Sequence, residues 1–205
     1  MSSKKENTRD RILSAAWKLL EKRHGRGVSM EDIAHAAGLS RQAVYLHFGS
    51  RAELLVATVR YVDERNEVPR QIRGIAAAGG GKETLEAFVD FWGGYIPKIF
   101  GLARALLDSR ASDPAAAAAW EDRMSAVRDG CRSVVECIVR DGLLAAGWTP
   151  GAAAEMMWAM FSVASWENLT RDLGWSNNDY VEKMKLALTR TFMEGSLSPG
   201  ASAGA

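Results

Sequence analysis

Residues 29–55, with the sequence SMEDIAHAAGLSRQAVYLHFGSRAELL, constrain the fold of this chain more than any other stretch. Ser29 and Asp32 have the spacing of a capping box, in which each side chain satisfies a free backbone amide at the start of a helix. Gly38 is the residue that most easily takes the left-handed conformation that ends a helix. A second serine–acid pair with the same spacing begins the last part of the stretch. The pattern therefore predicts two short helices joined by a tight turn, and then the start of a third.

The second of these short helices has two unlike sides. Ser40 is placed to cap it, and Val44 and Phe48, four residues apart, are expected to pack inward. A helix fits the major groove of DNA, which is about 12 Å wide, and presents its first residues to the base edges. The alternative that spacing leaves open is an ordinary helical corner in an all-α domain. The side chains left on the outer side are Arg41, Gln42, Tyr45 and His47.

The residue types on this helix suit DNA recognition. Arg41 can donate two hydrogen bonds to guanine, and Gln42 can pair with adenine. Ala43 offers a methyl-sized contact to the methyl group of thymine. The side chains expected to reach phosphates are Tyr45, His47 and Arg51.

Charge is distributed unevenly along the 205 residues. Residues 1–60 hold eleven Lys or Arg against six Asp or Glu, whereas residues 61–205 hold fifteen against nineteen. The net charge of only +1 argues against a protein that coats nucleic acid. A basic N-terminal part on a mildly acidic remainder suits a sequence-selective DNA binder, because phosphate neutralisation supplies much of its affinity. Chance asymmetry of solvated faces is the alternative.

The run of residues 8–59, with its GLS turn and its VYLHF followed by SRAELL, closely resembles the N-terminal DNA-binding domain of TetR-family transcriptional regulators. The resemblance implies an all-α fold, in which a three-helix helix-turn-helix domain precedes a helical ligand-binding and dimerisation domain, with about nine helices in total. Ala43 departs from the hydroxyl residue often found at its place. The resemblance implies base or phosphate contacts at Ser29, Arg41, Gln42, Ala43, Tyr45, His47 and Arg51.

The rest of the chain is predicted to be helical. Residues 1–50 form the expected DNA-binding domain, and a fourth helix, from 51 to about 67, links it to a regulatory domain over residues 68–194. Residues 70–81, rich in small side chains and closing on three glycines, form the best boundary. Pro97 is expected to break or kink a helix, and Asp113 with Pro114 to start a long one that ends at Gly147. Residues 195–205 are predicted to be a disordered tail.

The stretch at about 151–173 is predicted to be one helix that is apolar nearly all round, so it must be covered on two sides. One cover is the core of its own domain, and the other is a second copy of the chain. With the final helix at about 177–194 it would form a four-helix dimer contact. A dimer suits a palindromic operator, whose half-sites lie about 34–36 Å apart. A helix buried within a monomer is the alternative.

The second domain is rich in aromatic and soft side chains, which is consistent with a pocket for an apolar or aromatic small molecule. Such residues at helical spacing also occur as plain core. The resemblance implies a ligand cavity in this domain, with ligand binding shifting the spacing of the two DNA-reading parts and so releasing DNA. The candidate ligand residues are Trp92, Tyr95, Phe100, Trp120, Met124, Trp158 and Phe161.

Enzymes are the competing class, and the sequence disfavours them. All three histidines lie in the first 50 residues, so the second domain has none for a triad or a metal site. Neither a metal nor a cofactor is expected. No apolar run reaches the roughly 18 residues of a membrane span, and Cys131 and Cys137 are too far apart on one helix to bridge, so we expect a cytoplasmic protein.

The sequence thus predicts a homodimeric, DNA-binding transcriptional regulator, most simply a repressor that a small apolar or aromatic effector releases from a palindromic operator in double-stranded DNA. The alternative is a constitutive dimeric DNA-binding or architectural protein without an effector. The identity of the effector does not follow from the residues.

Overall fold

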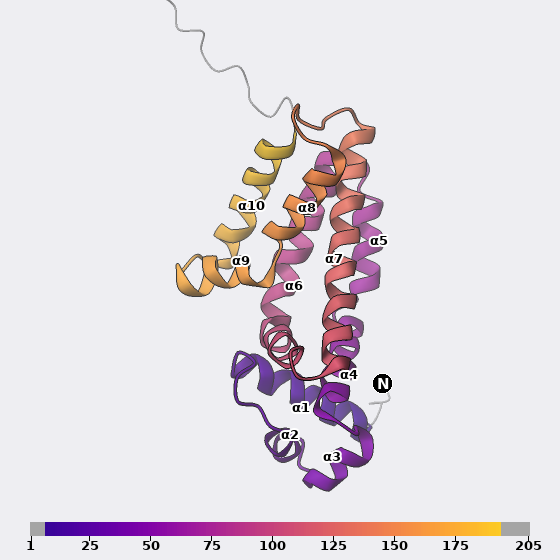
Figure 1. Cartoon of the computed structure of the whole chain (residues 1–205), viewed down its shortest axis with the longest axis vertical. Helices are drawn as coiled ribbons and strands as arrows, with labels where there is room; N and C mark the ends of the chain where they lie inside the picture. The colour runs from indigo at the N-terminus through magenta and orange to yellow at the C-terminus, as the bar shows by residue number, and fades with distance from the viewer. Residues whose placement is uncertain (1–6, 194–205) are drawn as a thin grey trace, which may run out of the picture. The chain divides into compact units, whose positions relative to one another are not determined.

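The computed structural model describes residues 7–193, and these residues form α-helices without any strand (Figure 1). The all-α fold class is confirmed, with ten α-helices and one π-helix in the described part where about nine helices were expected. The predicted tail at 195–205 lies outside the described residues. The helices are α1 (Thr8–Lys22), α2 (Met30–Ala36), α3 (Arg41–His47), α4 (Arg51–Arg65), α5 (Val68–Ala76), α6 (Gly81–Ser109), α7 (Pro114–Arg140), α8 (Pro150–Met160), α9 (Val163–Glu167), the π-helix η1 (Asn168–Asp172) and α10 (Asn177–Phe192).

The described residues fall into two compact units. The first unit contains the residues up to Pro69 together with Pro97–Met124, and the second contains Arg70–Ile96 and the residues from Ser125 onward. The first break falls after Pro69, and the regulatory domain expected over residues 68–194 stays a prediction. The sequence did not predict that residues 97–124 pack with the N-terminal segment.

Helices α1–α4 form what we call the reading head (residues 8–65), in which α1 packs on α2 and α4, and α2 packs on α3 (Figure 1). One side of α1 is apolar and buried, whereas Trp17 is only half-buried. Asn7 caps α1 by accepting a hydrogen bond from the backbone of Asp10 at 2.8 Å. The fully buried side chains of this side and of α4 are Ile12, Leu13, Ala16, Leu20, Leu54, Leu55 and Val62.

The second half of α6 is bound to the reading head through its backbone. The carboxylate of Glu21 accepts hydrogen bonds from the amides of Gly101 and Leu102, at 2.9 and 3.0 Å. The indole N–H of Trp17 donates to the carbonyl oxygen of Lys98 at 2.7 Å. These bonds lie just after Pro97, which has no N–H of its own to donate within the helix. They explain why residues 97–124 belong to the first unit.

Two predicted interruptions are helical in the structure. Pro97 lies inside α6, which continues without a break from Gly81 to Ser109. The small-residue segment after residue 69 is mostly α5, with Pro69 in its first turn, where a proline removes no helical hydrogen bond. Residues 70–76 of the predicted boundary segment are therefore helical.

Two helices are shorter in the structure than the sequence predicts. The helix that starts at Pro114 ends at Arg140 rather than Gly147, because Gly142 turns the chain and Leu144 then pairs with Met193 in an isolated bridge. The stretch at 151–173 is not one helix. Its break follows Phe161, where Ser162 adopts an extended conformation and accepts a hydrogen bond from the amide of Ser165 at 3.1 Å.

None of the helices in the described part is long and apolar enough to cross a membrane. Both cysteines are unbridged, and burial raises the pKa of the Cys131 thiol to about 12. The predicted absence of a disulfide between them agrees with this arrangement.

Candidate nucleic-acid interface

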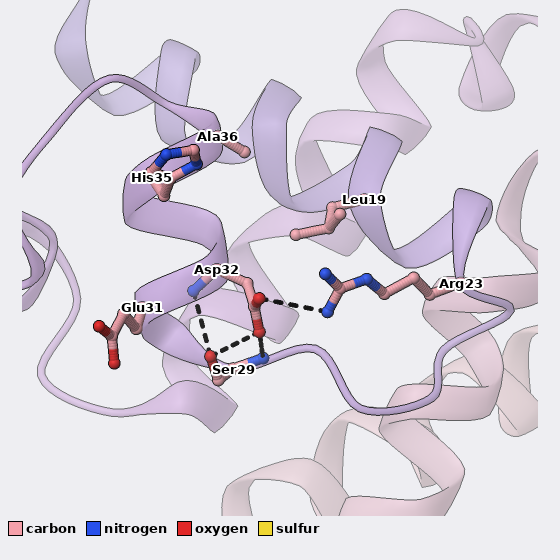
Figure 2. Close-up of a pocket in the computed structure, with 7 residues that line it drawn as sticks. All are labelled: Leu19, Arg23, Ser29, Glu31, Asp32, His35 and Ala36. Atoms are coloured by element: carbon pink, nitrogen blue, oxygen red, sulfur yellow. Dashed lines mark hydrogen bonds and ion pairs between the residues drawn. The ribbon is translucent and has the colours of Figure 1, made fainter.

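Helix α2 begins at the predicted capping box. The hydroxyl of Ser29 accepts from the amide of Asp32 at 3.1 Å, and the amide of Ser29 donates to the Asp32 carboxylate at 2.9 Å. Arg23, at the end of α1, reaches the same carboxylate at 3.2 Å (Figure 2). The hydrogen bonds from Ser29, with a smaller contribution from Arg23, lower the pKa of Asp32. The start of α2 is thus fixed to α1.

The turn between α2 and α3 is built on Gly38, which has φ of +65°. The amide of Leu39 donates to the carbonyl of Ala34 at 2.9 Å, and the amide of Gly38 donates to that of His35, which is a Schellman closure of the helix. Arg11 of α1 donates to the carbonyl of Ala37 at 2.8 Å. The angle between the two short helices is therefore held by backbone bonds and by α1.

Helix α3 is capped by Ser40, whose hydroxyl accepts from the amide of Ala43 at 3.1 Å. Val44 and Phe48 are fully buried, as predicted, and anchor the helix to the core of the head. The guanidinium of Arg9 lies 5.0 Å from the centre of the Phe48 ring. The two buried side chains leave the opposite side of α3 free to face a ligand.

That opposite side carries the predicted base-reading and phosphate residues. Arg41, Gln42, Tyr45 and His47 are all exposed. Arg41 lies over the ring of Tyr45, 5.5 Å from its centre, and the interaction with the Tyr45 side chain raises the pKa of the guanidinium. The stacking limits the conformations of Arg41, so fewer have to be lost when the side chain meets a base.

One exposed residue on α3 was missed. Leu46 has 84% of its surface exposed, although it is a large apolar side chain on a folded helix. It stands four residues after Gln42, so both lie on the same side of α3. Its spacing from Gln42 could have revealed it from the sequence. Ala43, the residue predicted to meet thymine, is half-buried.

Two of the predicted contact residues are already bound within the protein. Arg51 is half-buried and donates to the Val28 carbonyl at 3.3 Å and to the Ser109 hydroxyl at 2.6 Å. Burial lowers the pKa of the Arg51 guanidinium. The hydroxyl of Ser29 is used in the capping box. The phosphate contacts of these two residues remain predictions, and both also have structural roles.

A surface hollow of about 380 Å³ lies between α1 and α2, beside the capping box (Figure 2). Its lining carries both signs of charge, and two of those charged groups, Arg23 and Asp32, are joined to each other. We therefore interpret the hollow as a groove of the scaffold that positions α2. The residues that line it are Leu19, Arg23, Ser29, Glu31, Asp32, His35 and Ala36.

The seven candidate ligand residues are divided between the two units. Phe100, Trp120 and Met124 belong to the first unit, where Phe100 lies 6.1 Å from the ring of His24 and Trp120 lies under Arg110. The members in the second unit are Trp92, Tyr95, Trp158 and Phe161.

Within the second unit, Trp92 and Phe161 belong to one aromatic cluster. The ring of Phe161 meets Trp92 edge-on at 6.1 Å and Phe88 edge-on at 5.0 Å. Tyr95 instead stacks on Phe91 at 5.6 Å, and Trp158 lies under the guanidinium of Arg128 at 5.4 Å. Trp92 and Phe161 are thus the two predicted ligand residues that the structure brings into contact.

Comparison with known proteins links the reading head to one family. Residues 12–58 match the family described as bacterial regulatory proteins, tetR family. The regulator TtgR of Pseudomonas putida, described as an HTH-type transcriptional regulator, is 36% identical over 62 residues, which are 30% of this chain and 30% of TtgR. The chain matches the curated relatives over only about a third of their length.

Solved structures extend the similarity to the whole fold. A transcriptional regulator from Saccharomonospora viridis in complex with choline has a TM-score of 0.77 and 18% identity, covering 91% of this chain and 97% of that chain. SmeT in complex with triclosan has a TM-score of 0.68 and 18% identity, covering 95% and 96%. At these identities the similarity establishes the fold, while the ligands belong to those proteins.

Proposed function

We propose that this chain, whose residues 12–58 match the tetR family of bacterial regulatory proteins, is a member of that family and represses transcription as a homodimer on a palindromic operator. A small apolar or aromatic molecule, bound in the second unit, lowers its affinity for that operator.

The observation that carries the DNA-binding proposal is the outer side of α3. Its exposed side chains combine a guanidinium, an amide and a phenol on a helix whose other side is fully buried in the head. Guanidinium and amide groups are the side chains that recognise guanine and adenine in the major groove. This helix of seven residues is capped by Ser40 at its start and anchored by the buried Val44 and Phe48, so it presents them in a fixed orientation.

The dimer is supported by apolar surface in the second unit. Met156 on α8 is 47% exposed and Leu186 on α10 is 43% exposed, although both are large apolar side chains. The exposed neighbours of Met156 on α8, Ala152 and Ala159, are small and apolar. Apolar side chains on two helices of one unit suit contact with a second copy, and a dimer places two copies of α3 on one palindrome.

The test of DNA recognition is selection of bound sequences from random duplex DNA by the full chain, followed by sequencing. We expect enrichment of a palindrome. Arg41→Ala and Tyr45→Ala should each weaken binding to that palindrome, by roughly five- to a hundredfold for Arg41→Ala, which removes a base contact worth about 1–3 kcal/mol. The matched control is Arg60→Ala, which removes the same charge from the exposed side of α4.

The results would distinguish base recognition by α3, binding by charge alone, and DNA binding without sequence preference. A palindrome that depends on Arg41 and Tyr45 but not on Arg60 supports the assignment of α3. Equal losses in the Arg41 and Arg60 variants would mean that charge alone drives binding and would overturn sequence reading by α3. Absence of any enriched sequence would leave an architectural DNA-binding protein instead of a regulator.

Release by an effector is tested on the selected operator with two probes of different chemistry. Triclosan is apolar and aromatic, and choline is a small cation; each is bound by one of the similar structures. We expect triclosan to reduce operator affinity and choline to leave it unchanged, since the described buried polar residues carry no charge. Unchanged affinity with both would favour the constitutive DNA-binding protein.

A further inference from the structure

Two buried polar atoms in the second unit have no hydrogen-bond partner among its described residues. They are the indole nitrogen of Trp92 on α6 and the phenol oxygen of Tyr180 on α10. Trp92 is 4% exposed and Tyr180 is completely buried. Buried polar groups in proteins nearly always have a hydrogen-bond partner, so two such groups without one are unusual.

Two other tryptophans show the usual arrangement. Trp17 donates its indole N–H to Lys98, and Trp166, also buried, donates to the side-chain oxygen of Asn177 at 3.3 Å. The two buried threonines, Thr58 and Thr84, donate to carbonyl oxygens of their own helices. Unlike these four side chains, Trp92 and Tyr180 make no hydrogen bond of ordinary geometry.

The two groups lie close to each other. A Cβ atom at Gly93, next to Trp92, would meet Val181, next to Tyr180. Burial raises the pKa of the Tyr180 phenol to about 12, and a hydrogen-bonding interaction with the Trp92 side chain partly offsets that rise. An indole N–H can only donate, whereas a phenol can donate and accept. The indole can interact with the phenol oxygen, but neither group makes a hydrogen bond of ordinary geometry, so both N–H and O–H can donate to a single acceptor oxygen placed between them.

The surroundings of the pair are aromatic and uncharged. Phe161 meets both Trp92 and Phe88 edge-on. Asp90 on α6 and Lys185 on α10 pair with each other at 2.7 Å at the partly exposed edge, and Asp179, next to Tyr180, is exposed. A bound molecule would therefore meet aromatic carbon and two neutral donors, without a free charge to bind an ion.

The backbone that supplies Phe161 and Trp166 is irregular. Phe161 is the last residue of the α8 turn before the break at Ser162, and the π-helix η1 follows α9 directly. Single π-turns within helices occur frequently at functional sites. Phe161 therefore stands at a break in the helix, with its ring against those of Trp92 and Phe88.

We infer that Trp92 and Tyr180 are the polar anchor of a binding site for a neutral, largely apolar molecule that carries one hydrogen-bond acceptor oxygen, such as an aromatic ketone or ether. The acceptor oxygen binds between the two donors, and the rings of Phe88 and Phe161 contact the apolar part. The inference rests on the proposed function only in treating the bound molecule as the effector.

The test uses probe pairs that differ only in the acceptor. Benzophenone and diphenylmethane differ by a carbonyl in place of a methylene, as do acetophenone and ethylbenzene. Binding of all four to the full chain is measured by equilibrium dialysis, for the unaltered protein and for Tyr180→Phe and Trp92→Phe. The readout is the ratio of ketone to hydrocarbon affinity, because this ratio cancels changes in size and packing.

We expect each substitution to lower that ratio roughly fivefold to tenfold, the loss that follows from one hydrogen bond. The matched controls are Tyr61→Phe in the first unit and Trp148→Phe in the second, which make the same chemical changes elsewhere and should leave the ratio unchanged. In a ¹⁵N-labelled sample, the indole N–H signal of Trp92 should shift with each ketone and far less with its hydrocarbon partner.

An unchanged ratio in both variants, or no binding of either ketone, would overturn the inference, and Trp92 and Tyr180 would then be core residues only. The same samples are tested on the selected operator. Ketone binding that depends on Trp92 and Tyr180 but leaves operator affinity unchanged would retain the anchor and refute effector release. Operator release by triclosan without ketone binding would retain the proposed function and refute the anchor.

Discussion

The side-chain amide of Asn177 donates a hydrogen bond to the backbone carbonyl of Gly93 at 3.0 Å. Gly93 stands four residues before Pro97, so its carbonyl has no N–H to accept from within α6. The first residue of α10 thus supplies the donor that the proline removes. The same side chain also accepts from the indole of Trp166.

Replacing Asn177 should therefore destabilise the protein. Asn177→Ala leaves a partly buried carbonyl and the Trp166 indole without their partner, at a cost of about 1–3 kcal/mol in the free energy of unfolding. Asn178→Ala, the exposed neighbour, should change it by less than about 0.5 kcal/mol. Urea unfolding measures both. In a Pro97→Ala background, where α6 regains its own donor, the cost of Asn177→Ala should be smaller, and an unchanged cost would contradict this explanation.

At Gly101, α6 passes so close to the end of α1 that no side chain should fit. A Cβ atom added at Gly101 would clash with the backbone carbonyl of Leu20, which cannot rotate away. Gly101→Ala should cost about 1–3 kcal/mol of stability. Gly94→Ala on the same helix meets no atom within 4 Å and should be neutral or stabilise by up to about 1 kcal/mol. Thermal unfolding that gives equal shifts for the two variants would argue against close contact at Gly101.

The exposed Leu46 should contribute to DNA recognition without contributing to stability. Leu46→Ala should change the free energy of unfolding by less than about 0.5 kcal/mol, because the side chain is already in water. On the selected operator it should weaken binding by about 1 kcal/mol, roughly fivefold, if it covers a thymine methyl group. Ile72→Ala, which removes an exposed apolar side chain from α5, is the control. Equal operator affinity for the unaltered protein, Leu46→Ala and Ile72→Ala would show that Leu46 does not contribute to DNA binding.

The capping box of α2 should make the stability of the head depend on pH in the acid range. The pKa of Asp32 is lower in the folded protein than its ordinary value of 3.8, because Ser29 and then Arg23 stabilise the carboxylate. Its stabilising contribution is therefore complete well above pH 4 and is lost as the pH falls through the folded pKa.

Asp32→Asn should consequently be less stable than the unaltered protein at pH 7, with a difference that narrows as the pH falls below about 4. Unfolding by urea over this pH range measures the difference. Asp172→Asn, at an exposed position of η1, should show no comparable dependence. A difference for Asp32→Asn that stays constant down to pH 2 would rule out the carboxylate as its cause.

The reading head was largely predictable from sequence because its signals are local. The capping serines, Gly38 and the four-residue spacing of Val44 and Phe48 each act within a few residues, and the structure places α2 and α3 where these signals predict. The exposed side of α3 follows from the same spacing. Its roles at DNA remain predictions.

The features that sequence reasoning missed depend on contacts between distant segments. The break after Phe161 depends on Ser162, whose hydroxyl accepts a hydrogen bond from the amide of Ser165. Within an apolar run, the sequence alone does not distinguish such a capping serine from an ordinary small residue. Trp92 and Tyr180 are 88 positions apart in the sequence, so no local pattern shows that they lie close together. The hydrogen bond from Arg51 to Ser109 likewise joins distant segments and gives Arg51 a structural role beside its predicted DNA contact.

The carboxylate of Glu21, which holds the amides of Gly101 and Leu102, limits how this protein can be recombined with its relatives. A chimera joined near residue 68 would carry a foreign α6 against α1, and a side chain in place of Gly101 would collide with Leu20. A transferable DNA-binding module must therefore include residues 97–124 as well as the first 69, although they are separate in the sequence. Exchange of specificity is simpler on α3 itself, where the exposed side chains can be replaced without altering any of these contacts.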